Sequence, residues 1–235
     1  MSNFIKKKWS DVCTLEYGKG LRDYKNEDND YAVYGSAGII GTHSQYHQDE
    51  GVIVSRKGTL DVYYSDKPFF VIDTAFFLKT KPILNSKWAY YALKHYNIKK
   101  LASGTSVPSL SRDDFYETDL LLPALHYQSQ VESILSRIDK KIELNQEMNE
   151  TLEEIAKTLF KSWFINFDPV RAKAEGKPTG LSKEISNLFP DSFEDSELGE
   201  IPSGWHTKNL GQILTFLGSG KRPKGGASNT DDQIP

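Results

Sequence analysis

The sequence has one cysteine and no long apolar run. Cys13, alone among 235 residues, excludes an internal disulfide and a metal site built only from thiolates. The N-terminal stretch MSNFIKKKW has no apolar segment after its lysines, and no window approaches the roughly 18 apolar residues of a membrane span. We therefore expect a soluble, cytoplasmic protein in which Cys13 has a structural role on a strand.

The sequence also lacks an excess of positive charge. Its net charge of −3 argues against a generally basic nucleic-acid binder. Residues 1–123 carry 16 Lys and Arg against 15 Asp and Glu, whereas residues 124–167 carry 5 against 7 and residues 168–235 carry 8 against 10. Any contact with DNA is therefore expected from local basic clusters in the first segment.

One long stretch contains no helix breaker. Pro123 is tolerated at a first helical position, and neither glycine nor a further proline follows before Pro169. The sequence predicts a helix over 123–167, with about 40 residues and a length of about 60 Å. Globular helices average about 11 to 12 residues, so we favour a helix that pairs with a second helix over one folded onto its own domain.

Apolar residues recur along this helix in alternating steps of four and three, with two asparagines on the same stripe. This spacing is typical of a coiled coil, and a buried asparagine fixes the register at a cost in stability. The helix should therefore have a specific partner. The predicted seam comprises Val131, Leu135, Ile138, Ile142, Asn145, Asn149, Leu152 and Leu159.

Residues 9–121 indicate short strands separated by glycine-rich turns, because β-branched and aromatic residues alternate there. One helical interlude, 86–100, places Trp88, Tyr91 and Ala92 on one face. The predicted fold class is α+β: one globular domain of short strands and a few helices, a long coiled-coil helix and the start of a second repeat.

The second repeat is predicted from residue 204 onward. Trp205, an apolar run and Gly218-Ser219-Gly220 occur in the same order as Trp9, an apolar run and Gly18-Lys19-Gly20. We expect the sequence to end inside this second copy. The predicted organisation is a globular domain over 1–122, a helix over 123–167, a connector with a helical turn at most over 168–203, and the repeat over 204–235.

Four stretches carry a resemblance to a known family: GTSVPSLSRDDF (104–115), LLLP-x-x-x-x-Q (120–128), the long helix with its following NFDPVRAK, and LGEIPSGW (198–205). The sequence resembles the specificity subunit of type I restriction-modification systems, in which two target-recognition domains alternate with two long helices. The resemblance implies a non-catalytic DNA reader. It would dock methyltransferase subunits and, through them, restriction subunits, with S-adenosylmethionine, ATP and Mg expected on those partners.

Motifs of catalysis are incomplete in this chain. The element Asn166–Val170 lacks the second proline and the aromatic residue of an adenine-methyltransferase motif, and the acidic run after Pro190 lacks the lysine of a nuclease metal site. Arg222 follows Gly220-Lys221 where a P-loop has Ser or Thr. His43 and His47 lie four residues apart without a third ligand nearby. We expect no catalytic residue, metal or cofactor in the chain itself.

Base edges and phosphates must be contacted by polar and basic side chains, and the glycine-rich turns supply them. For the glycines themselves, Gly35, Gly38 and Gly41, a role as simple strand turns is favoured over a close approach to DNA. The predicted DNA-binding residues are Lys19, Arg22, Lys25, Tyr34, Ser36, His43, Arg56, Lys57, Ser103, Thr105 and Ser106.

Trp163, Phe164 and Phe167 give the end of the helix more aromatic surface than a spacer needs. They are expected either to dock the methyltransferase subunit or to pack on the recognition domain. Because the chain has one such helix, we expect an antiparallel homodimer that reads a palindromic site. The alternatives are a scaffold that no longer reads DNA and an enzyme with unrecognised motifs.

Overall fold

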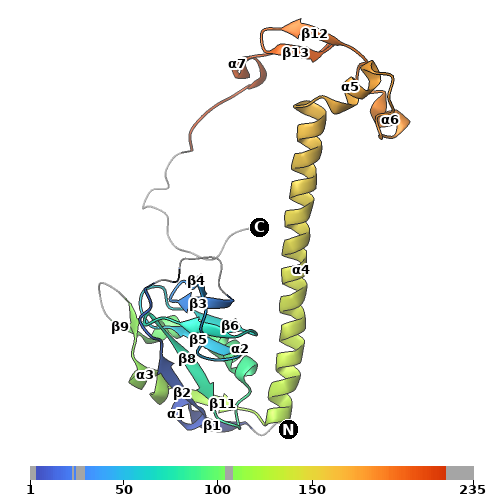
Figure 1. The fold of residues 1–235 in the computed structure, drawn as a ribbon. Coiled ribbons are helices and arrows are strands. Elements are labelled where there is room, and N and C mark those ends of the chain that lie inside the picture. Colours follow the sequence, from blue (N-terminus) through green and yellow to red (C-terminus); the bar gives the residue numbers. More distant parts are fainter. Residues whose placement is uncertain (1–3, 23, 25–29, 104–107, 221–235) are drawn as a thin grey trace. The chain divides into compact units, whose positions relative to one another are not determined.

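The computed structural model describes residues 4–22, 24, 30–103 and 108–220. The chain forms two compact units, Met1–Asn145 and Gln146–Pro235, and we describe each by itself. Figure 1 shows the order of their elements along the chain. Strands alternate with short helices before one long helix, which confirms the predicted α+β class.

Within its described residues, the first unit has eleven strands, three helices and a 3-10 helix before the long helix α4 begins. In chain order these are β1 (Ile5–Lys8), α1 (Trp9–Val12), β2 (Cys13–Tyr17), β3 (Tyr31–Gly35), β4 (Gly38–His43), β5 (Gly51–Ser55), β6 (Val62–Ser65), β7 (Phe69–Val71), β8 (Ala75–Thr80), α2 (Ser86–Tyr96), η1 (Ile98–Leu101), β9 (Ala102–Ser103), β10 (Ser109–Leu110), α3 (Arg112–Glu117), β11 (Asp119–Leu122) and α4 (Leu125–Phe164).

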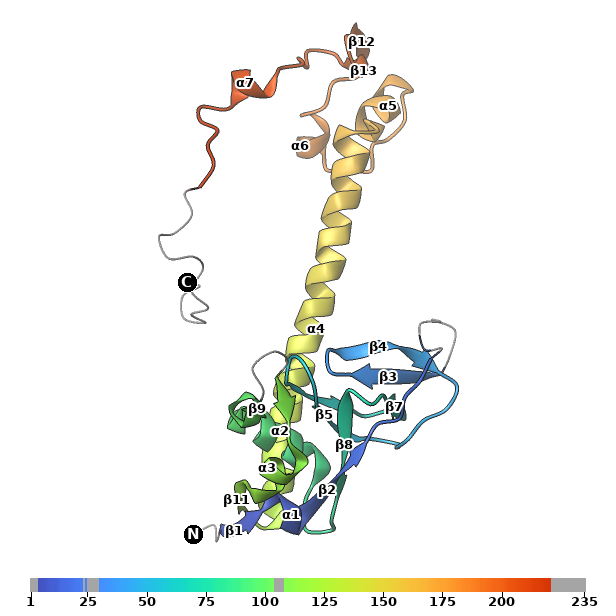
Figure 2. The ribbon, with the colours of Figure 1, turned by 90° about the vertical axis from the view of Figure 1, so that its left-hand side faces the viewer.

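A four-stranded antiparallel sheet, β2-β8-β5-β6, lies at the centre of this unit. All five residues of β5 are buried, and its side chains alternate between two cores. Val52 and Val54 pack in a cluster with residues of α1, α2 and α3, whereas Ile53 packs with Tyr34 and other residues of the second sheet. Figure 2 shows this arrangement, with α2 and α3 on one side of the central sheet and β3, β4 and β7 on the other.

The second sheet has the order β4-β3-β7, with β3 antiparallel to β4 and parallel to β7. A β-bulge interrupts the β3–β4 pairing between Val33 and Tyr34. Both side chains are buried, in two different clusters, so β3 is covered on both of its faces. Strand β1 pairs antiparallel with β11, the strand that precedes α4.

Helix α2 confirms a helix from residue 86, but the α-helix ends at Tyr96, before the predicted residue 100, and the 3-10 helix η1 follows it. The Asn85 side chain caps its start by accepting a hydrogen bond from the Trp88 amide, and Asn97, in a left-handed conformation with φ 60°, ends it. Trp88 of the predicted face is buried, together with Ala89 and Leu93, and Ala92 packs partly buried against the same cluster. Tyr91 is turned to α4 instead, and its hydroxyl donates to Asp139 Oδ2 at 2.6 Å.

Helix α4 has 40 residues, begins two residues after Pro123 and ends three residues before Phe167. At its end the amides of Ile165 and Asn166 both donate to the Lys161 carbonyl, and Phe167 takes a left-handed conformation with φ 57°. A non-glycine residue rarely adopts this conformation, and here it separates α4 from the next helix. The helix is continuous as predicted, and its bounds, Leu125–Phe164, are narrower than the predicted 123–167.

The second unit has more secondary structure than the sequence predicted. After α4 come α5 (Asp168–Ala174), α6 (Lys183–Ser186), β12 (Phe193–Ser196), β13 (Gly199–Pro202) and α7 (Leu210–Ile213). The expectation of one helical turn at most was wrong, because Pro169 lies in the first turn of α5, where a missing amide costs nothing. Strands β12 and β13 form an antiparallel hairpin.

The structure also bears on the single cysteine and on the lack of a long apolar run. Cys13 is fully buried at the start of β2, and burial raises the pKa of its thiol to about 12, which agrees with a structural role. In the described part of the chain, no helix combines the length and apolar character of a membrane span.

Candidate nucleic-acid interface

Gly18 fixes the point at which β2 ends. Its amide donates to the Ala75 carbonyl at 3.2 Å, and the next amide, of Lys19, donates to the Val71 carbonyl at 3.0 Å. A Cβ at Gly18 would lie 2.0 Å from the carbonyl oxygen of Ile72, so only glycine fits. The turn therefore holds Tyr17 and Lys19 at fixed places, and each lines a different cavity.

The first cavity, here called the arginine pocket, has a volume of about 330 Å³. The guanidinium Cζ of Arg56 lies 5.0 Å from the centre of the Tyr17 ring, and that of Arg112 lies 5.1 Å from the same centre. Such stacking of a cation on an aromatic face is attractive. The lining residues are Tyr17, Arg56, Lys57, Phe76, Ser109, Leu110, Ser111, Arg112 and Asp113.

The second cavity, here called the histidine pocket, has a volume of about 400 Å³. His47 Nδ1 accepts a hydrogen bond from the Val71 amide at 3.2 Å, and its ring stacks on Phe70 at 3.9 Å. Burial, and then the charges of Lys19 and His43, lower the pKa of His47. The lining residues are Lys19, Gly20, Leu21, His43, Ser44, Gln45, Tyr46, His47 and Phe70.

The second nitrogen of the His47 ring, Nε2, is buried. Because Nδ1 accepts, the neutral ring carries its proton on Nε2, which is buried and has no hydrogen-bond partner among the described residues. His43 and His47 do not form a metal site with a third ligand, since no group of three His, Cys, Asp or Glu suited to a metal occurs within residues 4–22, 24, 30–103 and 108–220.

The structure groups four of the predicted DNA-binding residues into these two pockets. Lys19 and His43 line the histidine pocket, and Arg56 and Lys57 line the arginine pocket. Arg22 is exposed and lines neither of them. Lys25, Thr105 and Ser106 lie outside the described residues.

Two predicted residues have structural roles. Tyr34 is only 7% exposed and packs edge-on against Phe69, so its prediction as a DNA contact is corrected. The Ser36 carbonyl accepts hydrogen bonds from Ser55 Oγ at 2.8 Å and from the Tyr63 hydroxyl at 3.3 Å, which holds the turn after β3.

Arg112 was missed by the sequence analysis. It is the first residue of α3, and the preceding Ser111 caps that helix by accepting from the Asp114 amide at 3.3 Å. The stretch SLSRDDF, already noted for its resemblance, contained the capping signal. It gave no indication that Arg112 would reach the turn at Gly18.

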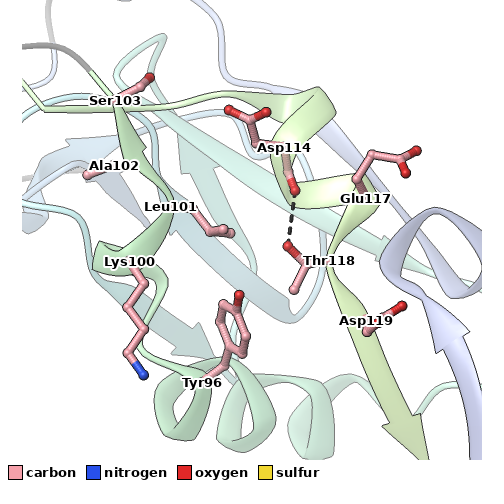
Figure 3. A pocket seen from close by; sticks show the side chains of 9 residues that line it. All are labelled: Tyr96, Lys100, Leu101, Ala102, Ser103, Asp114, Glu117, Thr118 and Asp119. Carbon is pink, nitrogen blue, oxygen red and sulfur yellow. Dashed lines mark hydrogen bonds between the residues drawn. The ribbon is translucent and has the colours of Figure 1, made fainter.

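A third cavity, shown in Figure 3, has the opposite character. Asp114, Glu117 and Asp119 border it on one side, facing Tyr96 and the segment from Lys100 to Ser103 on the other. Lys6 pairs with Asp119 at 2.7 Å, and Lys8 pairs with Glu117. Predicted Ser103 lies here, where Lys6, Lys8 and Lys100 only offset the three carboxylates, so this cavity offers a nucleic-acid backbone no excess of positive charge.

The first unit and much of α4 match a known protein family. The family described as "Type I restriction modification DNA specificity domain" matches residues 1–154, which include the first unit and much of α4. The chain belongs to this family.

Two curated relatives are specificity subunits of type I restriction enzymes. The HindI subunit of Haemophilus influenzae is 35% identical over 152 residues, which are 62% of this chain and 32% of that protein. The MjaIX subunit of Methanocaldococcus jannaschii is 30% identical over 143 residues, 59% of this chain and 29% of that one. Specificity subunits are the non-catalytic components of these systems, and this chain matches about a third of the length of each.

A solved structure shares the fold. The S subunit of a type I restriction-modification system from M. genitalium superposes with a TM-score of 0.63 at 21% identity, over 74% of this chain and 49% of that one. The likeness extends past the strand-rich unit and confirms the architecture of a type I specificity domain followed by a long helix.

In this specificity domain α4 exposes a broad apolar stripe. Of the predicted seam, Ile138, Ile142 and Leu152 are 50–55% exposed, whereas Leu135 is half-buried. The sequence analysis missed three further exposed apolar residues, each three positions after a seam residue and 50–59% exposed: Ile134, Met148 and Ile155. The apolar surface of α4 is thus wider than one heptad stripe.

The rings at the end of α4 have partners within the second unit that the sequence did not predict. Phe164 stacks with Trp205 at 6.0 Å, and Phe167 contacts the same indole edge-on at 5.7 Å. Trp163 contacts Phe189 at 5.8 Å. We call these five side chains, Trp163, Phe164, Phe167, Phe189 and Trp205, the aromatic cluster.

Proposed function

We propose that this chain is a DNA specificity subunit that reads one half of a bipartite site on double-stranded DNA. The surface that carries the proposal is the pair of pockets on either side of Gly18. Membership of the specificity-domain family supports DNA recognition in general. The arrangement of charge supports this particular surface.

The single observation behind this choice is unpaired positive charge. Lys19, Arg56, Lys57 and Arg112 form no ion pair with a carboxylate among the described residues, whereas Lys6, Lys8 and Lys94 each do. Cations without internal partners attract phosphate and release counterions when DNA binds. A net acidic chain therefore presents a local cationic surface around one fixed turn.

The proposal assigns the chemistry to other subunits. The chain would dock methyltransferase subunits, which bind S-adenosylmethionine, and through them restriction subunits that use ATP and Mg. The exposed apolar stripe of α4 and Phe164, which is 40% exposed within the aromatic cluster, support a docking role. Such an assembly would act on cellular DNA, in the cytoplasm.

The stripe on α4 also supports an antiparallel homodimer. Two copies related by a twofold axis would bring two recognition units to one duplex, and an isologous arrangement of this kind reads a palindrome. The predicted seam, widened by Ile134, Met148 and Ile155, supplies the apolar side chains for such a contact.

Methylation mapping tests the proposal directly. The chain is co-expressed with its methyltransferase subunit, and adenine methylation is mapped across the host genome, with the methyltransferase alone as the control. A gapped, palindromic motif that requires the chain is expected. An asymmetric gapped motif would instead show that another chain supplies the second recognition unit, and a stable complex without any motif would leave only a scaffold.

A further inference from the structure

We propose that Arg56 and Arg112 form a clamp for a phosphate group of the DNA backbone, with Tyr17 as the platform on which both guanidinium groups are held. This inference rests on the proposed function and deepens it, because it separates a residue pair that positions DNA from residues that read bases.

The main chain fixes Arg56 on both sides. Its amide donates to the Thr74 carbonyl at 2.9 Å, and its carbonyl accepts from the Leu110 amide at 2.9 Å. The side chain adds a third restraint, because Nη1 donates to the Asp73 carbonyl at 2.9 Å. One of five N–H donors is used in this way, so others remain for a ligand.

Arg112 brings a second guanidinium to the same ring. Since both Cζ atoms lie about 5 Å from the Tyr17 centre, they are within about 10 Å of each other. Two like charges at this separation repel, and neither has a carboxylate partner in the described part of the chain. Lys57 adds a third positive charge to the pocket and Asp113 one negative charge, which leaves a net charge of about +2 for a ligand to offset.

The geometry favours phosphate over a base edge. A side chain that reads bases has to project into a groove, whereas these guanidinium groups lie against rings of their own domain. Planar, bidentate donors of this kind match phosphate oxygens, and such contacts set the orientation of a protein on the duplex. A preorganised arginine also loses less side-chain entropy when DNA binds.

The test compares the DNA affinity of the unaltered chain with that of three variants, Arg56→Gln, Arg112→Gln and the two changes together. Two duplexes are used, one with the preferred motif and one of unrelated sequence. Arg171→Gln is the matched control, because Arg171 also stacks on a ring, Phe193 at 4.9 Å, and also donates to a carbonyl, but lies in the second unit. Affinity is measured by fluorescence anisotropy from about 50 to 200 mM salt.

We expect each single Arg→Gln change to weaken binding to both duplexes by the same factor, roughly tenfold at low salt, and to reduce the slope of log K against log salt by about 1. The control should match the unaltered chain. A variant with Lys at both positions should retain the slope, which separates lost charge from lost folding, and Arg112→Gln alters an exposed side chain.

The outcomes distinguish this inference from the function on which it rests. Loss confined to the preferred duplex would make the two arginines base readers and overturn the clamp. Unchanged affinity and slope in the double variant would overturn it as well, while DNA binding by the unaltered chain would leave the proposed function standing. If the unaltered chain binds neither duplex, both proposals fail.

Discussion

Within the histidine pocket, His47 is held differently from a surface histidine. The ring stacks with Phe70 and with Phe77, with ring centres 3.9 and 5.5 Å apart. Its Nδ1 accepts a hydrogen bond from the Val71 amide. Protonation would replace that acceptor with a donor and place a positive charge near Lys19. The neutral form is therefore the one that fits the fold, and this preference links stability to pH.

Replacement of His47 should remove an acid-sensitive part of the stability. The pKa of His47 lies below 6.5 in the folded chain, so the unfolded chain takes up the proton first as pH falls. The contribution of neutral His47 to the free energy of unfolding is fully present above pH 6.5, and it is lost as pH falls through the pKa of His47 in the folded chain. We expect the melting temperature of the unaltered chain to decrease from pH 7 to 5 more than that of His47→Gln, as measured by differential scanning fluorimetry.

The matched control for this experiment is His126→Gln, which removes a histidine from the exposed start of α4. Equal pH profiles for His47→Gln and the unaltered chain would show that the Val71 contact contributes nothing to acid sensitivity.

Among the elements, the start of α4 is held in the first unit by a buried, hydrogen-bonded side chain. Gln128 is fully buried and makes three hydrogen bonds: Oε1 accepts from the Asn85 amide at 2.8 Å, and Nε2 donates to the carbonyls of Ile83 at 3.0 Å and Pro123 at 2.8 Å. These bonds use all but one of the four that an amide side chain can make. The glutamine of the LLLP-x-x-x-x-Q stretch thus has a structural reason to be where it is.

Gln128→Leu should destabilise the first unit by about 3 kcal/mol, because one buried amide and two carbonyls would lose their partner. Urea unfolding followed by circular dichroism measures the change. Gln130→Leu, two positions further along on an exposed part of the same helix, is the control and is expected to stay within about 0.5 kcal/mol. Equal effects of the two changes would contradict this role for Gln128.

The aromatic cluster performs the corresponding task at the other end of α4. Trp205 joins the helix end to the segment after β13 through its contacts with Phe164 and Phe167. We expect Trp205→Ala to weaken the second unit by about 1 to 3 kcal/mol and to increase amide exchange in α5. Hydrogen exchange with mass spectrometry on the full-length chain measures this, and Trp205→Phe should retain most of the protection.

A comparison of Trp205→Ala with Trp163→Ala distinguishes contact with a partner subunit from packing within the aromatic cluster. If Trp163→Ala abolishes co-purification with the methyltransferase subunit while Trp205→Ala does not, Trp163 contacts the partner directly. Loss in both variants would mean that the partner requires the folded cluster, and loss in neither would remove the docking proposal for these rings.

At the scale of the whole molecule, the features that the sequence predicted are those carried by local pattern. The continuous helix follows from the absence of Gly and Pro, and the strands follow from β-branched and aromatic alternation. Tyr34 was misassigned because β3 is covered on both faces, which alternation in one strand cannot reveal. Arg112 was missed because its approach to Tyr17 depends on residues about 95 positions apart in the chain. The pockets depend on tertiary structure in the same way.

The proposed homodimer depends on the exposed apolar stripe of α4. Ile138 and Ile142 lie in the middle of the exposed stripe, 51% and 50% exposed, and between them and Leu152 lie the two asparagines that would fix the register. A carboxylate introduced at either position would lose its hydration in the seam without gaining a partner, which is strongly unfavourable.

The double variant Ile138→Asp with Ile142→Asp should therefore change the solution mass from two chains to one, as measured by light scattering. Lys140→Asp with Thr151→Asp introduces the same number of carboxylates at exposed positions on the side of the helix opposite Ile138 and Ile142, and should leave the dimer intact. A dimer that survives the first pair would place the contact on another surface. A single-chain mass for the unaltered protein would mean that α4 pairs with a helix of a different chain, and the methylation motif would then be asymmetric.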